Sequence, residues 1–208
     1  MVADITSPIS QYPLEGLSGD QSWTLLKRMA FEEEQQTINS NLKAIGMDIV
    51  KKCKGVPLAI KTIGRVLNYK KIEVEWSYIK DSELTNVTQL KDDIMLVLKL
   101  SYEHLPSHLK CCFAYCSLFP KDYLIVKLTL IQLWIAQGFI QSPDENLLLV
   151  DVADDYFKEL LWRSFFQEVE EDEGMTRSFK MHDLIHDLAQ YVSRIDCTLV
   201  DSNAKKCE

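Results

Sequence analysis

The sequence predicts a mainly α-helical protein, a small helical bundle followed by a second helical domain that contains a short β-hairpin. Apolar residues recur at helical spacing through most of the chain, as in Leu42, Ile45, Ile49 and Cys53. Glycine and proline stand where one helical pattern ends and the next begins. Between residues 165 and 181 the spacing changes to the alternation that is typical of strands.

The first helical patterns predict a small bundle. Ser18, with Gln21 three residues later, is typical of a capping box, so a helix is expected to begin there. Gly55 can end the second helix, and Pro57 suits the first turn of the third. Trp76 indicates a short fourth helix.

The second half of the chain predicts further helices and then the hairpin. These helices are expected over residues 94–105, 109–118, 128–139 and 152–166. Pro106, Pro120 and Gly138 are the expected ends of the first three. Alternating residues on both sides of a turn at Glu171–Gly174 indicate two strands. A run of helices followed by a small hairpin is the outline of a winged helix.

We therefore expect four segments. They are an irregular leading segment over 1–15, a helical bundle over 16–92, a winged-helix domain over 93–195, and a tail over 196–208 without regular structure. The polar stretch from Asp81 to Asp93 is the expected boundary between the two domains.

Composition bounds the class of protein. The formal net charge of -8 argues against nonspecific binding to nucleic acid or anionic lipid. No apolar run is long enough to span a bilayer, and the N-terminal residues do not read as a signal peptide. Four of the six cysteines lie in or beside apolar helical patterns, which is typical of reduced core residues in a cytosolic protein. We expect a cytoplasmic protein without membrane contact.

The triplet Met181-His182-Asp183 lies between the last predicted strand and the last predicted helix. We expect His182 in the first turn of that helix. Free backbone N–H groups and partial positive charge make a helix N-terminus attractive to phosphate. The triplet follows two other motifs, the segments Gly55-Val56-Pro57-Leu58-Ala59 and Cys112–Tyr123.

These three motifs, in this order, resemble those of plant NLR (NB-ARC) disease-resistance proteins. Gly55–Ala59 is similar to the family's Gly-Leu-Pro-Leu-Ala motif, with valine at position 56, and residues 181–183 match its Met-His-Asp motif in full. Cys112–Tyr123 resembles the version found in the coiled-coil subclass. The resemblance runs from about Tyr12 to about Ser193 and identifies 16–92 and 93–195 with the helical and winged-helix parts of the family's nucleotide switch.

The resemblance implies specific roles. In the family, the helical subdomain and the winged helix close over ADP, so Pro57 would pack near the adenine and His182 would reach the β-phosphate. Met181, His182 and Asp183 would form the switch motif, and exchange of ADP for ATP would free the winged helix to rotate. The partners implied are a nucleotide-binding domain, of which residues 1–15 would be a remnant, and leucine-rich repeats.

The phosphate-binding loop of that family is not found in these 208 residues. Such a loop needs Gly-Lys-Ser/Thr, and none of the seven glycines is followed by lysine. We therefore expect no catalytic residues, no ATPase activity and no tightly bound nucleotide in this chain alone. The sequence is interpreted as a fragment: a truncated product, a partial gene model or a degenerate paralogue.

Three other patterns resemble functional sites but are disfavoured. Leu147–Asp151 looks like a Walker B strand, but without a phosphate-binding loop it is better interpreted as the entry to a helix. Zinc binding by His104, His108 and the cysteines near them is disfavoured because Pro106 disturbs their shared register. His182 and His186 lack the glutamate of a His-Glu-x-x-His protease, so no metal site is expected.

The rival function is a stand-alone winged-helix adaptor that binds DNA or protein without nucleotide. The candidate recognition helix, residues 128–139, contains no lysine or arginine, and Lys127 stands alone at its start. Few phosphate contacts are therefore possible, and we expect no nucleic acid partner.

Overall fold

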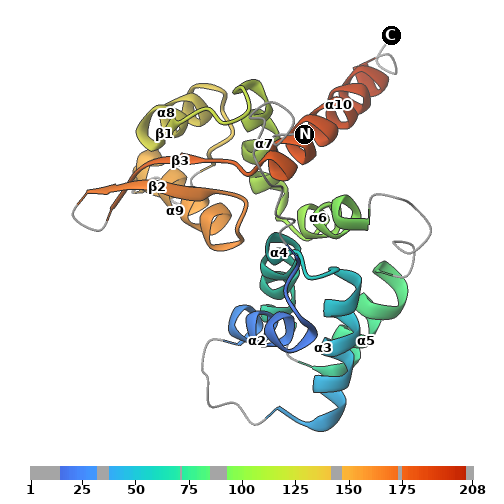
Figure 1. Ribbon diagram of the computed structural model, residues 1–208. Coiled ribbons are helices and arrows are strands. Elements are labelled where there is room, and N and C mark those ends of the chain that lie inside the picture. The colour runs from blue at the N-terminus through green and yellow to red at the C-terminus, as the bar shows by residue number, and fades with distance from the viewer. Residues whose placement is uncertain are drawn as a thin grey trace, which may run out of the picture.

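The computed structural model describes residues 15–31, 38–70, 72–84, 93–141, 147–172 and 175–204. It has two hydrophobic cores with one helix between them (Figure 1). We call the part built around the first core the bundle lobe (α2 to α5) and the part built around the second the winged-helix lobe (α7 to α10). The predicted leading segment, except for Glu15, and the last four residues lie outside the described residues.

The bundle lobe consists of four α-helices and one π-helical turn. These are α2 (Gly19–Ala30), α3 (Ser40–Lys52), α4 (Pro57–Asn68), α5 (Glu73–Tyr78) and η1 (Ile79–Glu83). The predicted capping box is present: the Gln21 N–H donates to Ser18 Oγ and the Ser18 N–H donates to Gln21 Oε1. Pro57 is the first residue of α4, as expected.

A tight corner at Gly55 leads into α4. Gly55 has φ +71°, and its carbonyl accepts a 2.9 Å hydrogen bond from the Leu17 N–H. A Cβ added at Gly55 would lie 2.6 Å from the Leu17 carbonyl oxygen. Both the left-handed backbone and the close approach of another segment require glycine here.

The winged-helix lobe combines helices with a small sheet. In chain order it contains α7 (Ser107–Tyr115), η3 (Cys116–Leu118), β1 (Ile125–Val126), α8 (Lys127–Ala136), α9 (Leu149–Trp162), β2 (Gln167–Asp172), β3 (Met175–Lys180) and α10 (Asp183–Ala204). The described strands form one antiparallel sheet in the order β1-β3-β2. The sequence predicted the β2–β3 hairpin but not β1, because two residues are too few to show alternation.

Helix α6 (Asp93–Glu103) lies between the two cores. Val97 and Leu100 belong to the core of the bundle lobe, whereas Leu98 and Tyr102 belong to the core of the winged-helix lobe. One helix therefore packs against both lobes, and in Figure 1 it lies between them. The predicted domain boundary falls at its start, and residues 85–92 of that boundary lie outside the described residues.

Two predicted boundaries in the second half are wrong. Helix α9 ends at Trp162 rather than Phe166, because Ser164 adopts a left-handed backbone (φ +67°) that turns the chain into β2. Helix α10 continues to Ala204, whereas no regular structure was predicted after Ile195. Neither glycine nor proline occurs between residues 183 and 204 to end the helix.

Other predicted ends are confirmed. α8 stops before Gly138 (φ +73°), and the Walker B-like segment lies at the start of α9, where Leu149 is the first helical residue. Within the described part of the chain, none of the helices combines the length and the apolar character that crossing a membrane requires.

Candidate functional site

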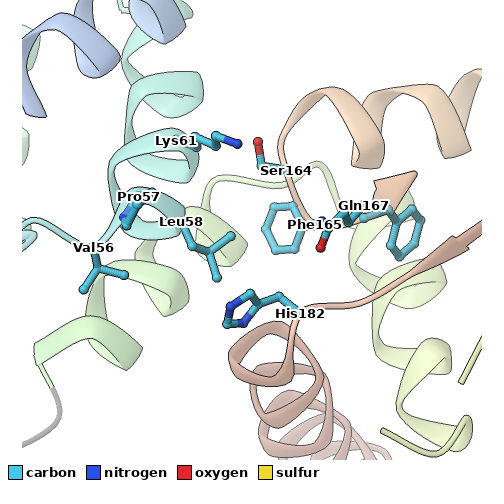
Figure 2. Close-up of a pocket in the computed structure, with 9 residues that line it drawn as sticks. Val56, Pro57, Leu58, Lys61, Ser164, Phe165, Gln167 and His182 are labelled. Atoms are coloured by element: carbon cyan, nitrogen blue, oxygen red, sulfur yellow. The ribbon is translucent and has the colours of Figure 1, made fainter. Parts of the chain in front are cut away.

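A cavity of about 310 Å³ lies where the two lobes meet. Three segments far apart in sequence line it: the start of α4, the turn from α9 into β2, and the residue before α10 (Figure 2). The lining residues are Val56, Pro57, Leu58, Lys61, Ser164, Phe165, Phe166, Gln167 and His182. Pro57 and His182, the two binding residues implied by the resemblance, thus line the same cavity.

The wall from the bundle lobe is the first turn of α4. Pro57 occupies the first helical position, where its missing N–H is not needed. Leu58 packs against the core of the winged-helix lobe, although it belongs to α4. Lys61 lies one turn further along and extends toward Ser164 in Figure 2.

The facing wall comes from the end of α9 and the start of β2. Phe165 and Phe166 are buried, and the Phe165 ring meets Phe113 edge to face with 4.8 Å between centroids. Gln167 is exposed and begins β2. These two buried rings within the turn fix the position of this wall, while Ser164 and Gln167 line the cavity.

His182 lies immediately before α10, one residue earlier than the predicted first turn, because the helix begins at Asp183. The residue therefore acts as the N-cap. Its carbonyl accepts from the Ile185 and His186 N–H groups at 2.8 and 2.9 Å, and its Nδ1 accepts from the Leu184 N–H at 3.2 Å. Since Nδ1 is an acceptor, the neutral ring carries its proton on Nε2, which can donate to a ligand.

The other members of the switch triplet have different surroundings. Met181 is buried in the core of the winged-helix lobe, and Asp183 is exposed in the first turn of α10. A carboxylate in that position favours the helix through its dipole. Of the triplet, His182 is the residue that lines the cavity.

The polar side chains around the cavity favour an anion. Lys61, Ser164, Gln167 and His182 can all donate hydrogen bonds, and no acidic residue occurs among the described residues that line it. This is notable in a chain with a net charge of -8. Lys61 was not predicted as a site residue, although its place four residues after Pro57 puts both on one helix face. Ser164 and Gln167 carry no local signal in the sequence.

His186 has a structural position. It is 3% exposed, and its Nε2 hydrogen-bonds to the Phe119 carbonyl oxygen at 2.7 Å, which ties α10 to the segment after η3. His182 and His186 are four residues apart in sequence but lie in different surroundings. His182 lines the cavity, whereas His186 is buried. Among the described residues, no group of three or more His, Cys, Asp or Glu side chains is placed to hold a metal ion.

The candidate DNA-reading helix α8 presents little positive charge. Lys127, the cation at its start, is only 16% exposed and pairs with Asp154 at 2.5 Å. Burial alone would raise the pKa of Asp154, but the hydrogen bonds from Lys127 and Lys158 outweigh it and lower that pKa. A lysine already neutralised within the lobe is poorly placed to contact a phosphate backbone.

Comparison with known proteins agrees with this fold. The winged helix domain of disease resistance proteins matches residues 118–189. The chain is 49% identical over 188 residues to disease resistance protein RGA2 from Solanum bulbocastanum. These aligned residues cover 90% of this chain and 19% of that protein. Disease resistance protein RPM1 from Arabidopsis thaliana is 36% identical over 192 residues, or 90% of this chain and 20% of that protein. The chain thus spans about a fifth of the length of these relatives.

The fold and this match define the class: a winged-helix module, not itself catalytic, packed on a helical bundle. Over 90% of its length the chain is similar to plant disease resistance proteins of the NLR type, and residues 118–189 match their winged helix domain.

Proposed function

We propose that this chain is the regulatory part of an ADP/ATP-dependent switch in a cytoplasmic plant immune receptor. In this proposal, ADP held by a nucleotide-binding domain also contacts the cavity between the two lobes and keeps them together. Exchange for ATP releases the winged-helix lobe. The chain itself supplies no ATPase centre.

One observation carries the proposal: Pro57 and His182, 125 positions apart in the numbering, line the same cavity from opposite lobes. A ligand in that cavity touches both lobes, so its binding free energy depends on their relative position. The apolar face at Val56–Leu58 suits a flat base, and the donors of His182 and Lys61 suit phosphate oxygens.

The proposed partners follow from the same arrangement. Nucleotide affinity in such sites comes largely from backbone amides and a lysine in a phosphate-binding loop, which this sequence does not show. A nucleotide-binding domain must therefore supply that half of the site, in the same protein or in another chain. Leucine-rich repeats are the second partner proposed from the family resemblance.

The test uses a receptor in which this chain replaces the homologous segment of a full-length relative such as RGA2. His182→Ala should cause cell death in leaf tissue without a pathogen, at normal protein abundance. Lys43→Ala, on the exposed surface of α3 and outside the cavity, is the control and should stay silent. A silent His182→Ala receptor at normal abundance would contradict the switch.

A further inference from the structure

The ends of α4 and α9 meet beside the cavity and carry matching side chains. Arg65 lies in the last turn of α4 and Tyr69 is the C-cap of that helix, while α9 ends at Trp162 with Arg163 as its cap. The Arg65 guanidinium carbon lies 4.1 Å from the centroid of the Trp162 ring. The Arg163 guanidinium carbon lies 4.6 Å from the centroid of the Tyr69 ring. Each arginine therefore stacks on an aromatic ring of the other lobe.

The two rings also contact each other. Tyr69 and Trp162 meet edge to face, with 5.6 Å between centroids and 76° between ring planes. Such a geometry is favoured over face-to-face stacking. The four side chains thus form a reciprocal set in which each lobe gives one cation and one ring.

We propose that Arg65, Tyr69, Trp162 and Arg163 form a clasp between the lobes that sets the width of the cavity. Lys61 precedes Arg65 by one turn of α4, and Ser164 directly follows Arg163; both line the cavity. The distance between α4 and the end of α9, which the clasp fixes, is therefore also the distance between two cavity walls. The effect on ligand binding rests on the proposed function, whereas the clasp itself does not.

The clasp is anchored within the winged-helix lobe. Arg163 is 6% exposed, and its Nε and Nη2 both donate to Glu159 Oε1, at 3.0 and 2.8 Å. Its guanidinium is thus held in place by its own helix before it meets Tyr69. Tyr69 is 53% exposed, so the Arg163–Tyr69 end is open to solvent and should be the weaker of the two.

Each arginine also suits its own helix. Arg65 lies in the last turn of α4 and Arg163 caps α9, and positive charge is favoured at the C-terminal ends of helices. Each arginine is therefore stabilised by its own helix even when the lobes are apart. The contacts with the aromatic ring of the other lobe add stabilisation only when the lobes are together. Separating the lobes breaks the ring contacts without unfolding either helix.

The test measures opening of the junction in the full chain without nucleotide. A cysteine introduced as Leu58→Cys, on α4 against the other lobe, is labelled with a bulky maleimide, and labelling is read by peptide mass spectrometry. The buried thiols of Cys53 and Cys112 report unfolding of the bundle and winged-helix lobes in the same sample. Arg65→Gln, Trp162→Leu and their combination are compared with Lys110→Gln, which removes a cation–π pair within the winged-helix lobe.

We expect each single clasp variant to raise the labelling rate at position 58 by about 2- to 30-fold. The double variant should exceed the larger single effect only slightly, because both remove the same contact. Lys110→Gln should leave the rate unchanged. An unchanged labelling rate at position 58 in the clasp variants overturns the proposal. An equal rise in the labelling of Cys53 or Cys112 also overturns it, since Arg65 and Trp162 would then only stabilise one lobe against unfolding.

A second arm concerns the ligand. In the receptor that contains the nucleotide-binding domain, saturating ADP should slow labelling at position 58 in both the native clasp and the Trp162→Leu variant, because a ligand that contacts both lobes binds only when they are together. A labelling rate that ADP binding leaves unchanged overturns the link to the cavity. If the native receptor binds no ADP while the labelling result holds, the clasp stands and the proposed nucleotide function fails.

Discussion

The two walls of the cavity are built on different principles. The bundle wall begins at a corner where Gly55 has a left-handed backbone and is hydrogen-bonded to Leu17, and it continues into an unbroken helix at Pro57. The winged-helix wall consists of element ends: Ser164 after α9, and His182 before α10. The first wall has its shape fixed by backbone, whereas the second presents its polar groups from turns and caps.

This difference assigns the lobes separate parts in the proposed switch. A wall fixed by backbone can offer a surface of constant shape to a base. A wall made of caps can change its hydrogen bonds when the lobe moves, since the His182 ring and carbonyl accept from the first amides of α10 and lie outside the helix itself.

Gly55→Ala should break the fixed wall. The alanine would need φ near +71° and would place its Cβ 2.6 Å from the Leu17 carbonyl oxygen. We expect the free energy of unfolding to fall by about 2–4 kcal/mol, measured by urea denaturation. Gly138→Ala is the matched control: its φ is +73°, but nothing lies within 4 Å of the added Cβ. It should cost only about 1–2 kcal/mol; equal losses at both positions would show that the corner is not specially packed.

Asp154→Asn should weaken the winged-helix lobe at its polar junction with α8. Asp154 binds Lys127 at 2.5 Å and Lys158 at 2.9 Å. Loss of the carboxylate should lower the free energy of unfolding at pH 7 by about 1.5 kcal/mol. Asp155→Asn, at a 76% exposed carboxylate, is the control and should change it by less than about 0.5 kcal/mol.

This prediction has a defined pH dependence. The folded state lowers the pKa of Asp154 below its ordinary value of 3.8, so its stabilisation is complete above that value. It is lost as the pH falls from 3.8 through the lower folded-state pKa. The native chain and the asparagine variant should therefore converge in stability under acid, and a difference that grew below pH 3.8 would contradict the assignment.

His182→Ala should destabilise the start of α10 slightly, and His182→Asn should not. Alanine removes the acceptor for the Leu184 N–H, whereas asparagine is among the preferred N-cap residues. We expect a loss of about 0.5–1 kcal/mol for alanine and almost none for asparagine, measured by thermal unfolding. Equal losses would mean that the ring is needed for packing rather than for capping.

Thiol labelling compares the two lobes without changing their stability. Burial raises the pKa of both Cys53, in the bundle lobe, and Cys112, in the winged-helix lobe, to about 12. Both should react with iodoacetamide at pH 8 far more slowly than the exposed Cys111. Peptide mass spectrometry gives the rates, and rapid labelling of one buried thiol would show that its lobe opens readily.

The fold was largely predictable because its signals are local. Capping at Ser18, the corner at Gly55 and the stop at Gly138 each depend on a few neighbouring residues. The missed features are tertiary. β1 is too short to show a period. The sequence predicts a helix where α6 lies but gives no sign that it faces two cores, and Ser164 and Gln167 join the cavity only through folding.

For the site, Pro57 and His182 could be named from motifs in the sequence, and their roles came from the family resemblance. Position 182 was placed one residue too far into the helix, because a cap and a first turn look alike in sequence. The contact of Arg65 with Trp162 and of Arg163 with Tyr69 could not be predicted, since side chains 97 and 94 positions apart carry no shared pattern.

The most direct test of the proposed switch is ADP affinity in the receptor that carries this chain, with His182→Asn as the variant. Asparagine keeps the helix cap but is too short to replace the imidazole in the cavity, so stability and ligand contact are separated. The native receptor should bind ADP about 10- to 100-fold more tightly than the variant by calorimetry, because a hydrogen bond to a charged phosphate contributes about 1.5–3 kcal/mol. Equal ADP affinities in two equally stable receptors would contradict a role for His182 in holding the nucleotide.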